Sequence, residues 1–244
     1  MELKPKVTAI IPCHNHRKWL GDAITSILVQ SYLVKSLIIV DDHSTDGSAE
    51  YVKEMIKETR MEPIIKLVEN TTEKHGPSIA RNIGIQTGWE NTDLFAFLDS
   101  DDIYHKDKIK KSVEIFNKDP QNIGVVYSDY NTLSIETGQK YRQYKEPFSR
   151  ERLIQECIVN CDSLISKRAF ETCGLFDEQL RVCEDYDRWL HFSERFVICH
   201  IPEALVDIRV GSHSSTSTVK SEIWKQCYSR VMQKIQERMN GKQK

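Results

Sequence analysis

Four short, nearly continuous apolar runs alternate with amphipathic segments in the first hundred residues. The runs cover residues 7–11, 37–40, 64–68 and 94–98. Runs of this kind are typical of parallel strands that are covered on both faces. Between them, apolar residues recur at helical spacing. This rhythm predicts an α/β fold with a mostly parallel central sheet and helices on both faces.

The second half of the chain is less regular but continues without a break. Helices are expected over residues 108–116, 152–158, 167–172 and 184–192. Strands are expected over residues 124–127, 162–165, 196–198 and 204–206, with a polar hairpin over 130–144. No linker rich in proline, glycine or serine and no internal repeat divides the chain. We therefore expect residues 1–217 to form a single domain.

Charge and composition narrow the possible partners and compartments. The 34 basic and 36 acidic residues nearly cancel, which argues against nucleic acid as the main partner. No apolar stretch approaches the roughly 20 residues that a membrane-spanning helix needs. The N-terminus leads directly into a strand and lacks the apolar segment of a signal peptide, so a cytoplasmic protein is expected. Seven cysteines without a Cys-x-x-Cys pair favour reduced, mostly buried thiols over a zinc site or disulfides.

An acidic cluster stands at the end of the fourth apolar run. Residues 99–102 read Asp-Ser-Asp-Asp, and crowded carboxylates at a strand end repel one another and resist desolvation. A divalent cation such as Mg²⁺ or Mn²⁺ would resolve that conflict, since hard oxygen ligands suit both ions. The alternative is a turn with a helix cap. The first two runs also end in polar residues, at 12–15 and 41–42, and in a parallel sheet these ends meet at one edge, where ligands bind.

Residues 218–244 are expected to form a basic amphipathic helix. Its apolar stripe consists of Ile223, Trp224, Cys227, Val231 and Ile235. Its basic residues are Lys220, Lys225, Arg230, Lys234 and Arg238. Packing on the body of the protein is the favoured arrangement. Peripheral contact with an anionic membrane is the alternative.

Six segments in order resemble the family 2 glycosyltransferases of GT-A fold, over nearly all of residues 7–217. The segments are IPCHN (11–15), VDDHSTDG (40–47), GPSIARN (76–82), FLDSDD (97–102), GLFD (174–177) and EDYDRWL (184–190). The resemblance implies transfer of a sugar, with inversion, from a nucleotide-diphosphate sugar, most simply a UDP-sugar. The donor would bind residues 1–102, and a glycan or lipid-linked acceptor would bind residues 103–217. Polysaccharide or other glycan synthesis is the expected setting.

The resemblance also assigns the nucleoside pocket. Pro12, His14 and Asn15 would line it. Asp42, or alternatively Asp41, would accept a hydrogen bond from the edge of the base, where a pyrimidine imide offers only a donor. His43 departs from the pattern, because glycine is usual at that position.

The diphosphate and metal positions follow from the same resemblance and remain partly open. Asp99 would contact the ribose hydroxyls or a metal-bound water, and Asp101 would hold Mn²⁺ or Mg²⁺. Asp102 could share that role, and His213 matches a histidine that many GT-A enzymes bring back to the metal or diphosphate. Arg81 would contact the diphosphate or hold its own loop in place, with neither role favoured.

Asp185 is the expected general base. An attacking hydroxyl must lose its proton, and a positioned carboxylate accepts it, while the cation would stabilise the departing diphosphate. The alternative is that Glu184 and Asp185 only cap a helix. Two other functions stay open: a sugar-phosphate nucleotidyltransferase, and a nucleotide-sugar-binding module without catalysis.

Overall fold

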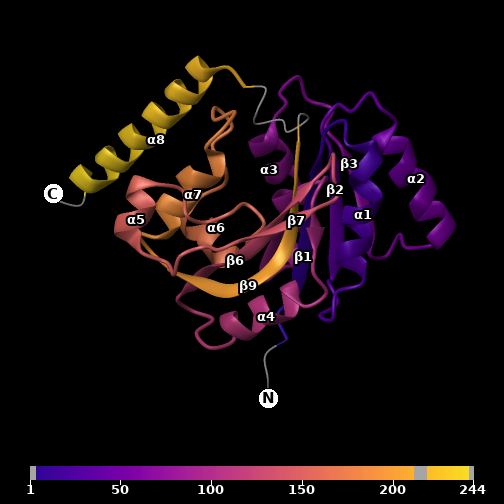
Figure 1. Cartoon of the computed structure of the whole chain (residues 1–244), viewed down its shortest axis with the longest axis horizontal. Coiled ribbons are helices and arrows are strands. Elements are labelled where there is room, and N and C mark those ends of the chain that lie inside the picture. Colours follow the sequence, from indigo (N-terminus) through magenta and orange to yellow (C-terminus); the bar gives the residue numbers. More distant parts are fainter. Residues whose placement is uncertain (1–3, 212–218, 242–244) are drawn as a thin grey trace.

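The computed structural model describes residues 4–211 and 219–241 and has the predicted α/β architecture (Figure 1). Its first half contains β1 (Val7–Cys13), α1 (Arg17–Leu28), β2 (Ser36–Asp41), α2 (Ser48–Thr59), β3 (Ile65–Glu69), α3 (Pro77–Gly88), the short 3₁₀ helix η1 (Trp89–Asn91) and β4 (Leu94–Phe97). These strands lie in the order β3-β2-β1-β4, and each strand runs parallel to its neighbours in this order. The carboxyl ends of β1, β2 and β4 therefore meet at one edge, as predicted.

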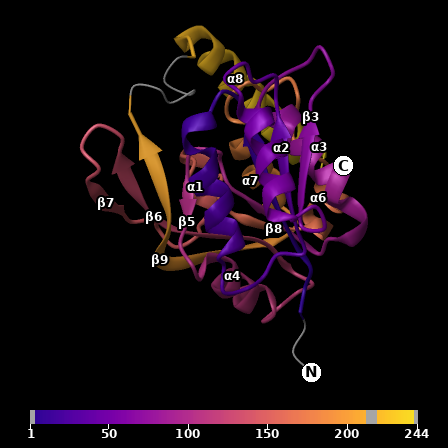
Figure 2. The same cartoon turned by 90° about the vertical axis from the view of Figure 1, so that its right-hand side faces the viewer.

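The second half extends the same sheet with mixed pairing. It contains β5 (Ile103–Tyr104), α4 (Lys108–Phe116), β6 (Ile123–Ser134), β7 (Lys140–Gln143), α5 (Arg150–Gln155), β8 (Leu164–Ser166), α6 (Lys167–Cys173), α7 (Glu184–Phe192), β9 (Val197–Val210) and α8 (Ser221–Gly241). The sheet continues from β4 through β8, β6 and β9 to β5, and β7 pairs with β6. The β6–β7 hairpin and β9 extend to one side of the helical layers (Figure 2).

Two apolar cores explain why the central strands are apolar at nearly every position. In β4, Leu94 and Ala96 face the core that contains α1, α2 and α4. Phe95 and Phe97 face the core on the opposite side, to which α3, α6, α7 and α8 contribute. Because alternate side chains of a strand point to opposite faces, a strand buried on both faces must be apolar throughout.

The expectation of two separate late strands, at 196–198 and 204–206, was wrong. A single strand, β9, spans both, and it curves strongly along β6 (Figure 1). The pairing with β6 steps from Ser128 opposite Ile201 to Asp129 opposite Ala204, so Pro202 and Glu203 are extra residues at a bulge. Proline cannot donate to the ladder, but a bulge accommodates it without ending the strand.

The C-terminal helix α8 packs on the body, as the favoured prediction stated. Cys227, Val231 and Ile235 are buried against the core that contains α7. All seven cysteines are free thiols; Cys13, Cys173 and Cys227 are buried, and the other four are half-buried. No helix within residues 4–211 and 219–241 is long and apolar enough to cross a membrane.

A left-handed residue at the end of α2 provides a test of the backbone geometry. Arg60 follows the helix with φ of 55° and ψ of 38°, a conformation that glycine adopts without a steric penalty. We expect Arg60→Gly to raise the free energy of unfolding by about 0.5–1 kcal/mol, measured by urea denaturation. Thr59→Gly, one residue earlier inside the helix, is the control and should lower it. Equal destabilisation by both variants would contradict the assigned conformation.

Candidate active site

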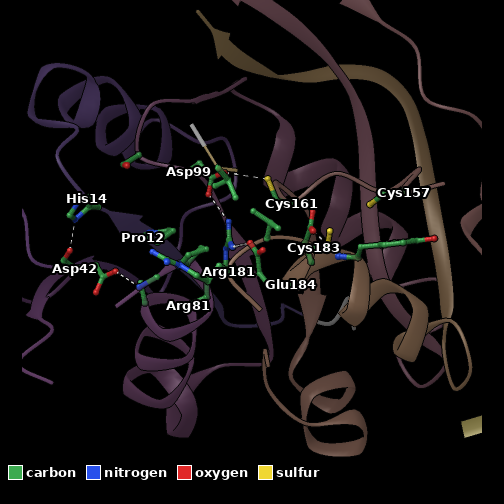
Figure 3. Close-up of a pocket in the computed structure, with 18 of the residues that line it drawn as sticks. Pro12, His14, Asp42, Arg81, Asp99, Cys157, Cys161, Arg181, Cys183 and Glu184 are labelled. Atoms are coloured by element: carbon green, nitrogen blue, oxygen red, sulfur yellow. Dashed lines mark hydrogen bonds and ion pairs between the residues drawn. The ribbon is translucent and has the colours of Figure 1, made fainter. Parts of the chain in front are cut away.

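A cavity of about 870 Å³ opens at the carboxyl edge of β1, β2 and β4. Seven of the predicted site residues line it: Pro12, His14, Asp42, Arg81, Asp99, Asp101 and Asp185. Figure 3 shows His14 and Asp42 at one end and Cys157 and Cys183 at the other, with Asp99 and Arg81 between them. The structure thus brings together residues that are as much as 173 positions apart in the chain, from Pro12 to Asp185 (185 − 12).

The loops after β1 and β2 are tied together at the first end of the cavity. His14 Nδ1 donates to the carbonyl oxygen of Asp42 over 2.6 Å. The Asn15 side chain accepts a hydrogen bond from the Thr45 amide over 2.7 Å, and its backbone is left-handed with φ of 57°. Asn15 is not among the residues that line the cavity, so its contacts hold the two loops in register.

Asp42 is oriented by the loop that leads into α3. Its two carboxylate oxygens accept from the Asn70 side-chain amide and the Gly76 backbone amide, each over 2.7 Å. Each oxygen keeps a lone pair for a further donor. Asp41 is buried but does not line the cavity; one of its oxygens accepts from the Ser44 amide over 3.1 Å. His43, which directly follows Asp42, adopts a left-handed backbone with a φ of 62°. Glycine adopts this conformation without a steric penalty, which explains why it suits that position.

The acidic cluster divides between the cavity and the interior. Asp101 lines the cavity, and its carboxylate lies 3.8 Å from His16 Nδ1. Burial and the charge of Asp99 raise the pKa of Asp101. Asp102 points elsewhere: it is buried, is not among the lining residues, and accepts from the Arg209 amide of β9 over 2.8 Å. Of these two carboxylates, only Asp101 is placed where it could hold a metal ion in the cavity.

A second group of donors lies beside Asp99. One ligand atom each from Asp99, Cys161 and Asp162 fall within 4.8 Å of one another. Asp162 is fully buried, and its Oδ1 has no hydrogen-bond partner among the described residues. Burial disfavours the charged form of both an acid and a base. It therefore raises the pKa of Asp162 to about 7 and lowers the pKa of the buried Lys108 to about 8. Crowded carboxylates with an unpartnered buried oxygen fit a divalent cation.

Arg81 connects the acidic cluster to the N-terminus of α7. Its guanidinium donates to Asp99 over 2.8 Å and to Glu184 over 2.6 Å, and its side chain is only 5% exposed. Burial opposes the charge, but the two carboxylates prevail and raise the pKa of Arg81 above its usual range. The observed contacts match a role in holding the loops together. The two terminal nitrogens of the guanidinium make these contacts, one to each carboxylate.

Asp185 lines the cavity from the first turn of α7. One of its oxygens accepts from the Tyr186 amide over 2.7 Å. Burial raises the pKa of Asp185, with Arg81 opposing that shift and Asp99 adding to it. The N-cap of α7 is Cys183, whose side chain makes no capping hydrogen bond. Glu184 instead binds Arg81, so the helix-cap alternative does not describe its contacts.

Several residues of the site were not predicted from the sequence, and one predicted residue cannot be placed. Glu184 was noted only as a possible cap, although its pairing with Arg81 organises the centre of the cavity. Cys161 and Asp162 precede the buried strand β8. The signal in the sequence that could have indicated them is a pair of polar residues next to a short apolar run. His213 lies outside the described residues.

Comparison with known proteins identifies the class. The model of glycosyl transferase family 2 matches residues 8–174, more than half of the chain. This chain therefore belongs to glycosyltransferase family 2, and it is a glycosyltransferase.

Individual relatives support this assignment. An uncharacterized glycosyltransferase of Rickettsia prowazekii (strain Madrid E) is 30% identical over 227 residues, covering 90% of this chain and 68% of that protein. TuaG of Bacillus subtilis (strain 168), whose proposed role is in teichuronic acid biosynthesis, is 27% identical over 225 residues, covering 91% of this chain and 84% of TuaG.

Solved structures show the same fold. S. aureus TarS 1–349 in complex with UDP aligns with a TM-score of 0.68 at 20% identity, covering 84% of this chain and 61% of that one. The mannosyltransferase PcManGT from Pyrobaculum calidifontis, in complex with GDP-Man and Mn²⁺, aligns with a TM-score of 0.68 at 17% identity, covering 88% and 60%. The chain thus spans about 60% of these solved chains. The expected GT-A fold is confirmed.

Proposed function

We propose that this glycosyltransferase moves a sugar from a nucleotide-diphosphate sugar, most simply a UDP-sugar, to a hydroxyl of a glycan or lipid-linked acceptor, with inversion at the sugar carbon. The observation that carries the proposal is that Asp101 and Asp185, from opposite halves of the chain, line one cavity. A volume of about 870 Å³ is within the range of small-molecule sites and would accommodate a nucleotide sugar.

The donor would bind at the end of the cavity formed by Pro12, His14 and Asp42. Asp42 is held by two hydrogen bonds and still offers acceptor capacity to the imide of a pyrimidine base. Asn15 and Asp41 would act by shaping these loops. The fold neighbours support a nucleotide-sugar donor, because they were solved with UDP, UDP-GlcNAc and GDP-Man.

A divalent cation, Mn²⁺ or Mg²⁺, would bind beside Asp99 and Asp101. Asp99 and Asp101 line the same cavity, and Asp99 also belongs to the donor group that it forms with Cys161 and Asp162. A fold neighbour was solved with GDP-Man and Mn²⁺. When bound, the cation would stabilise the negative charge of the leaving diphosphate. Arg81 would position Asp99 through the ion pair between them. Asp102 is less suited as a ligand, because it binds the β9 backbone and does not line the cavity. His213, also proposed as a ligand, lies outside the described residues.

Asp185 would act as the general base. The acceptor hydroxyl loses its proton to the Asp185 carboxylate while its oxygen forms the new bond to the anomeric carbon. The bond from that carbon to the diphosphate oxygen breaks, and the bonding electron pair leaves with the nucleotide. Because a single displacement occurs on the face opposite the leaving group, the configuration inverts.

A melting experiment tests donor and metal binding together. We expect UDP with Mn²⁺, at about 100 times the Kd, to raise the Tm by roughly 5–10 °C, since a ligand that binds only the native state stabilises it. Asp101→Asn should remove the increment that Mn²⁺ adds. Asp93→Asn is the matched control, because Asp93 is exposed and precedes β4 at the opposite end of the sheet. The absence of a shift with any UDP, GDP or dTDP ligand would refute the proposal.

The two alternative functions have their own readouts. A sugar-phosphate nucleotidyltransferase would release pyrophosphate from a nucleoside triphosphate and a sugar phosphate. A binding module without catalysis would take up nucleotide equally with and without metal and turn over no acceptor. The cavity-facing Asp185, with its raised pKa, favours catalysis over the binding module. The match to glycosyl transferase family 2 favours sugar transfer over nucleotidyl transfer.

The proposed organisation keeps residues 1–217 as the catalytic domain and 218–244 as a C-terminal helix. Arg230, Lys234 and Arg238 of α8 form ion pairs with Asp177, Asp187 and Glu194 of the body. These basic residues are therefore engaged within the protein, which favours the packed position of α8 over a membrane surface. TuaG's proposed role supports polysaccharide synthesis as the setting.

A further inference from the structure

The helix α8 forms part of the cavity wall as well as packing on the body. Val219, Trp224 and Tyr228 are among the residues that line the cavity with Asp185. Trp224 is 37% exposed and Tyr228 is 45% exposed, whereas the neighbouring Cys227 is buried. The first turns of α8 thus anchor on one face and present two large aromatic side chains to the cavity.

Ion pairs fix the position of this aromatic face. Lys234 contacts Asp187 of α7 over 2.7 Å and Asp177 over 3.0 Å, and Arg230 contacts Asp177 over 3.0 Å. Hydrogen bonds from the Gln179 backbone amide and from these two basic groups outweigh the effect of burial and lower the pKa of Asp177 to about 2. Because Asp187 is fully buried, the charged contact has little solvent screening and α8 is held firmly against α7.

The aromatic face continues onto the catalytic helix. The rings of Tyr228 and Tyr186 are stacked, with centroids 6.4 Å apart and an interplanar angle of 18°. The orientation of the Tyr186 ring is fixed by a hydrogen bond, because its hydroxyl donates to the Leu153 carbonyl oxygen over 2.8 Å. It also directly follows Asp185, so the aromatic face adjoins the proposed base.

We propose that Trp224 and Tyr228 of α8 form the acceptor subsite and that this subsite binds a pyranose ring. This inference rests on the proposed function. A pyranose presents an apolar C–H face and hydroxyl groups at its edge. An aromatic surface matches the face, and the hydrogen-bonding side chains of Gln155 and Glu156, which line the same cavity, match the edge.

The polar lining argues against a hydrocarbon chain as the occupant. A lipid tail on this surface would remove water from the carboxylates of Glu156 and Asp185 and offer them no hydrogen bond in return, which carries a desolvation cost. A sugar satisfies both requirements, because its hydroxyl groups donate to carboxylates. The acceptor class is therefore a carbohydrate, free or as the terminal sugar of a larger molecule.

Saturation-transfer NMR with methyl pyranosides tests the subsite directly. The protein is first loaded with UDP and the diamagnetic ion Mg²⁺, and methyl glucoside, galactoside, mannoside and N-acetylglucosaminide are titrated. We expect at least one pyranoside to bind, and Trp224→Ala and Tyr228→Ala each to weaken that binding at least tenfold. Tyr228→Phe keeps the ring and should bind within about threefold of the wild type. Met239→Ala, at the exposed far end of α8, is the matched control and should change nothing.

The outcomes separate this inference from the proposed function. The Tm increase with UDP and Mn²⁺ should persist in both alanine variants, and its absence in the wild type would refute the donor site instead. If UDP binds but no pyranoside does, or if the alanine variants bind as the wild type does, the acceptor subsite is refuted. Binding of dodecyl glycosides without binding of their methyl counterparts would show that a hydrocarbon chain occupies the surface, which also overturns the inference.

Discussion

Asp185→Asn should lower the kcat for sugar transfer by about 10²–10⁴, because the amide cannot accept the proton of the attacking hydroxyl. The substitution keeps the size of the side chain, and its hydrogen bond from the Tyr186 amide can be retained through the amide oxygen. Donor binding should therefore persist. The measurement is the initial rate of nucleotide release in the presence of acceptor, together with the Tm increase caused by UDP and Mn²⁺.

The pH dependence gives a second signature of the same residue. Burial raises the pKa of Asp185, so the base becomes protonated at a higher pH than an exposed aspartate would. The wild-type rate should fall as the pH decreases through that raised pKa, and the residual rate of Asp185→Asn should lack this limb. Asp93→Asn is the control and should keep both the rate and the limb. A rate for Asp185→Asn within threefold of the wild type would exclude Asp185 as the base.

Arg81→Met should lower the free energy of unfolding by about 3–5 kcal/mol, because removing one partner of a buried ion pair leaves the other charge unpaired. Glu184 has a side chain only 11% exposed and accounts for most of this cost, whereas Asp99, at 34%, is partly screened by solvent. Transfer activity should also fall, since Asp99 and the N-terminus of α7 lose their common anchor. Urea denaturation measures the stability.

A double variant separates the ion pair from packing effects. In the single variant Arg81→Met, the buried charge of Glu184 has lost its partner. Adding Glu184→Gln removes that charge, so the double variant should recover at least about 1 kcal/mol of the lost free energy of unfolding. Lys53→Met is the control, since Lys53 forms an exposed ion pair with Glu69 and should change stability by less than about 1 kcal/mol. A loss below 1 kcal/mol for Arg81→Met would contradict the structural role of Arg81.

The sequence sufficed to predict which residues meet at this edge of the sheet, because parallel strands impose a geometry. When β1, β2 and β4 run in the same direction, the residues that follow them must meet at one edge. Pro12 lies near the end of β1, whereas Asp42 and Asp99 follow β2 and β4, and the structure brings all three to the same cavity. Continuous apolar patterning therefore locates this edge from the sequence alone.

The remaining features depend on tertiary contacts that local pattern does not encode. Asp101 and Asp102 are adjacent and chemically identical, yet one faces the cavity and the other binds the β9 backbone. Arg81 and Glu184 are 103 residues apart, and nothing near either one indicates the other. The stripe of α8 was read as an apolar face, but Trp224 in it lines the cavity while Val231 is buried in the core.

The central claim is that one cavity holds the cation and donor on one side and the general base on the other. Anomalous diffraction from crystals grown with Mn²⁺ and UDP tests it directly. The account predicts one strong Mn²⁺ peak at the carboxylates of Asp99 and Asp101, with the UDP diphosphate on the same ion and Asp185 facing the same cavity. A Mn²⁺ peak or a nucleotide bound elsewhere on the molecule, with this cavity empty, would contradict the account.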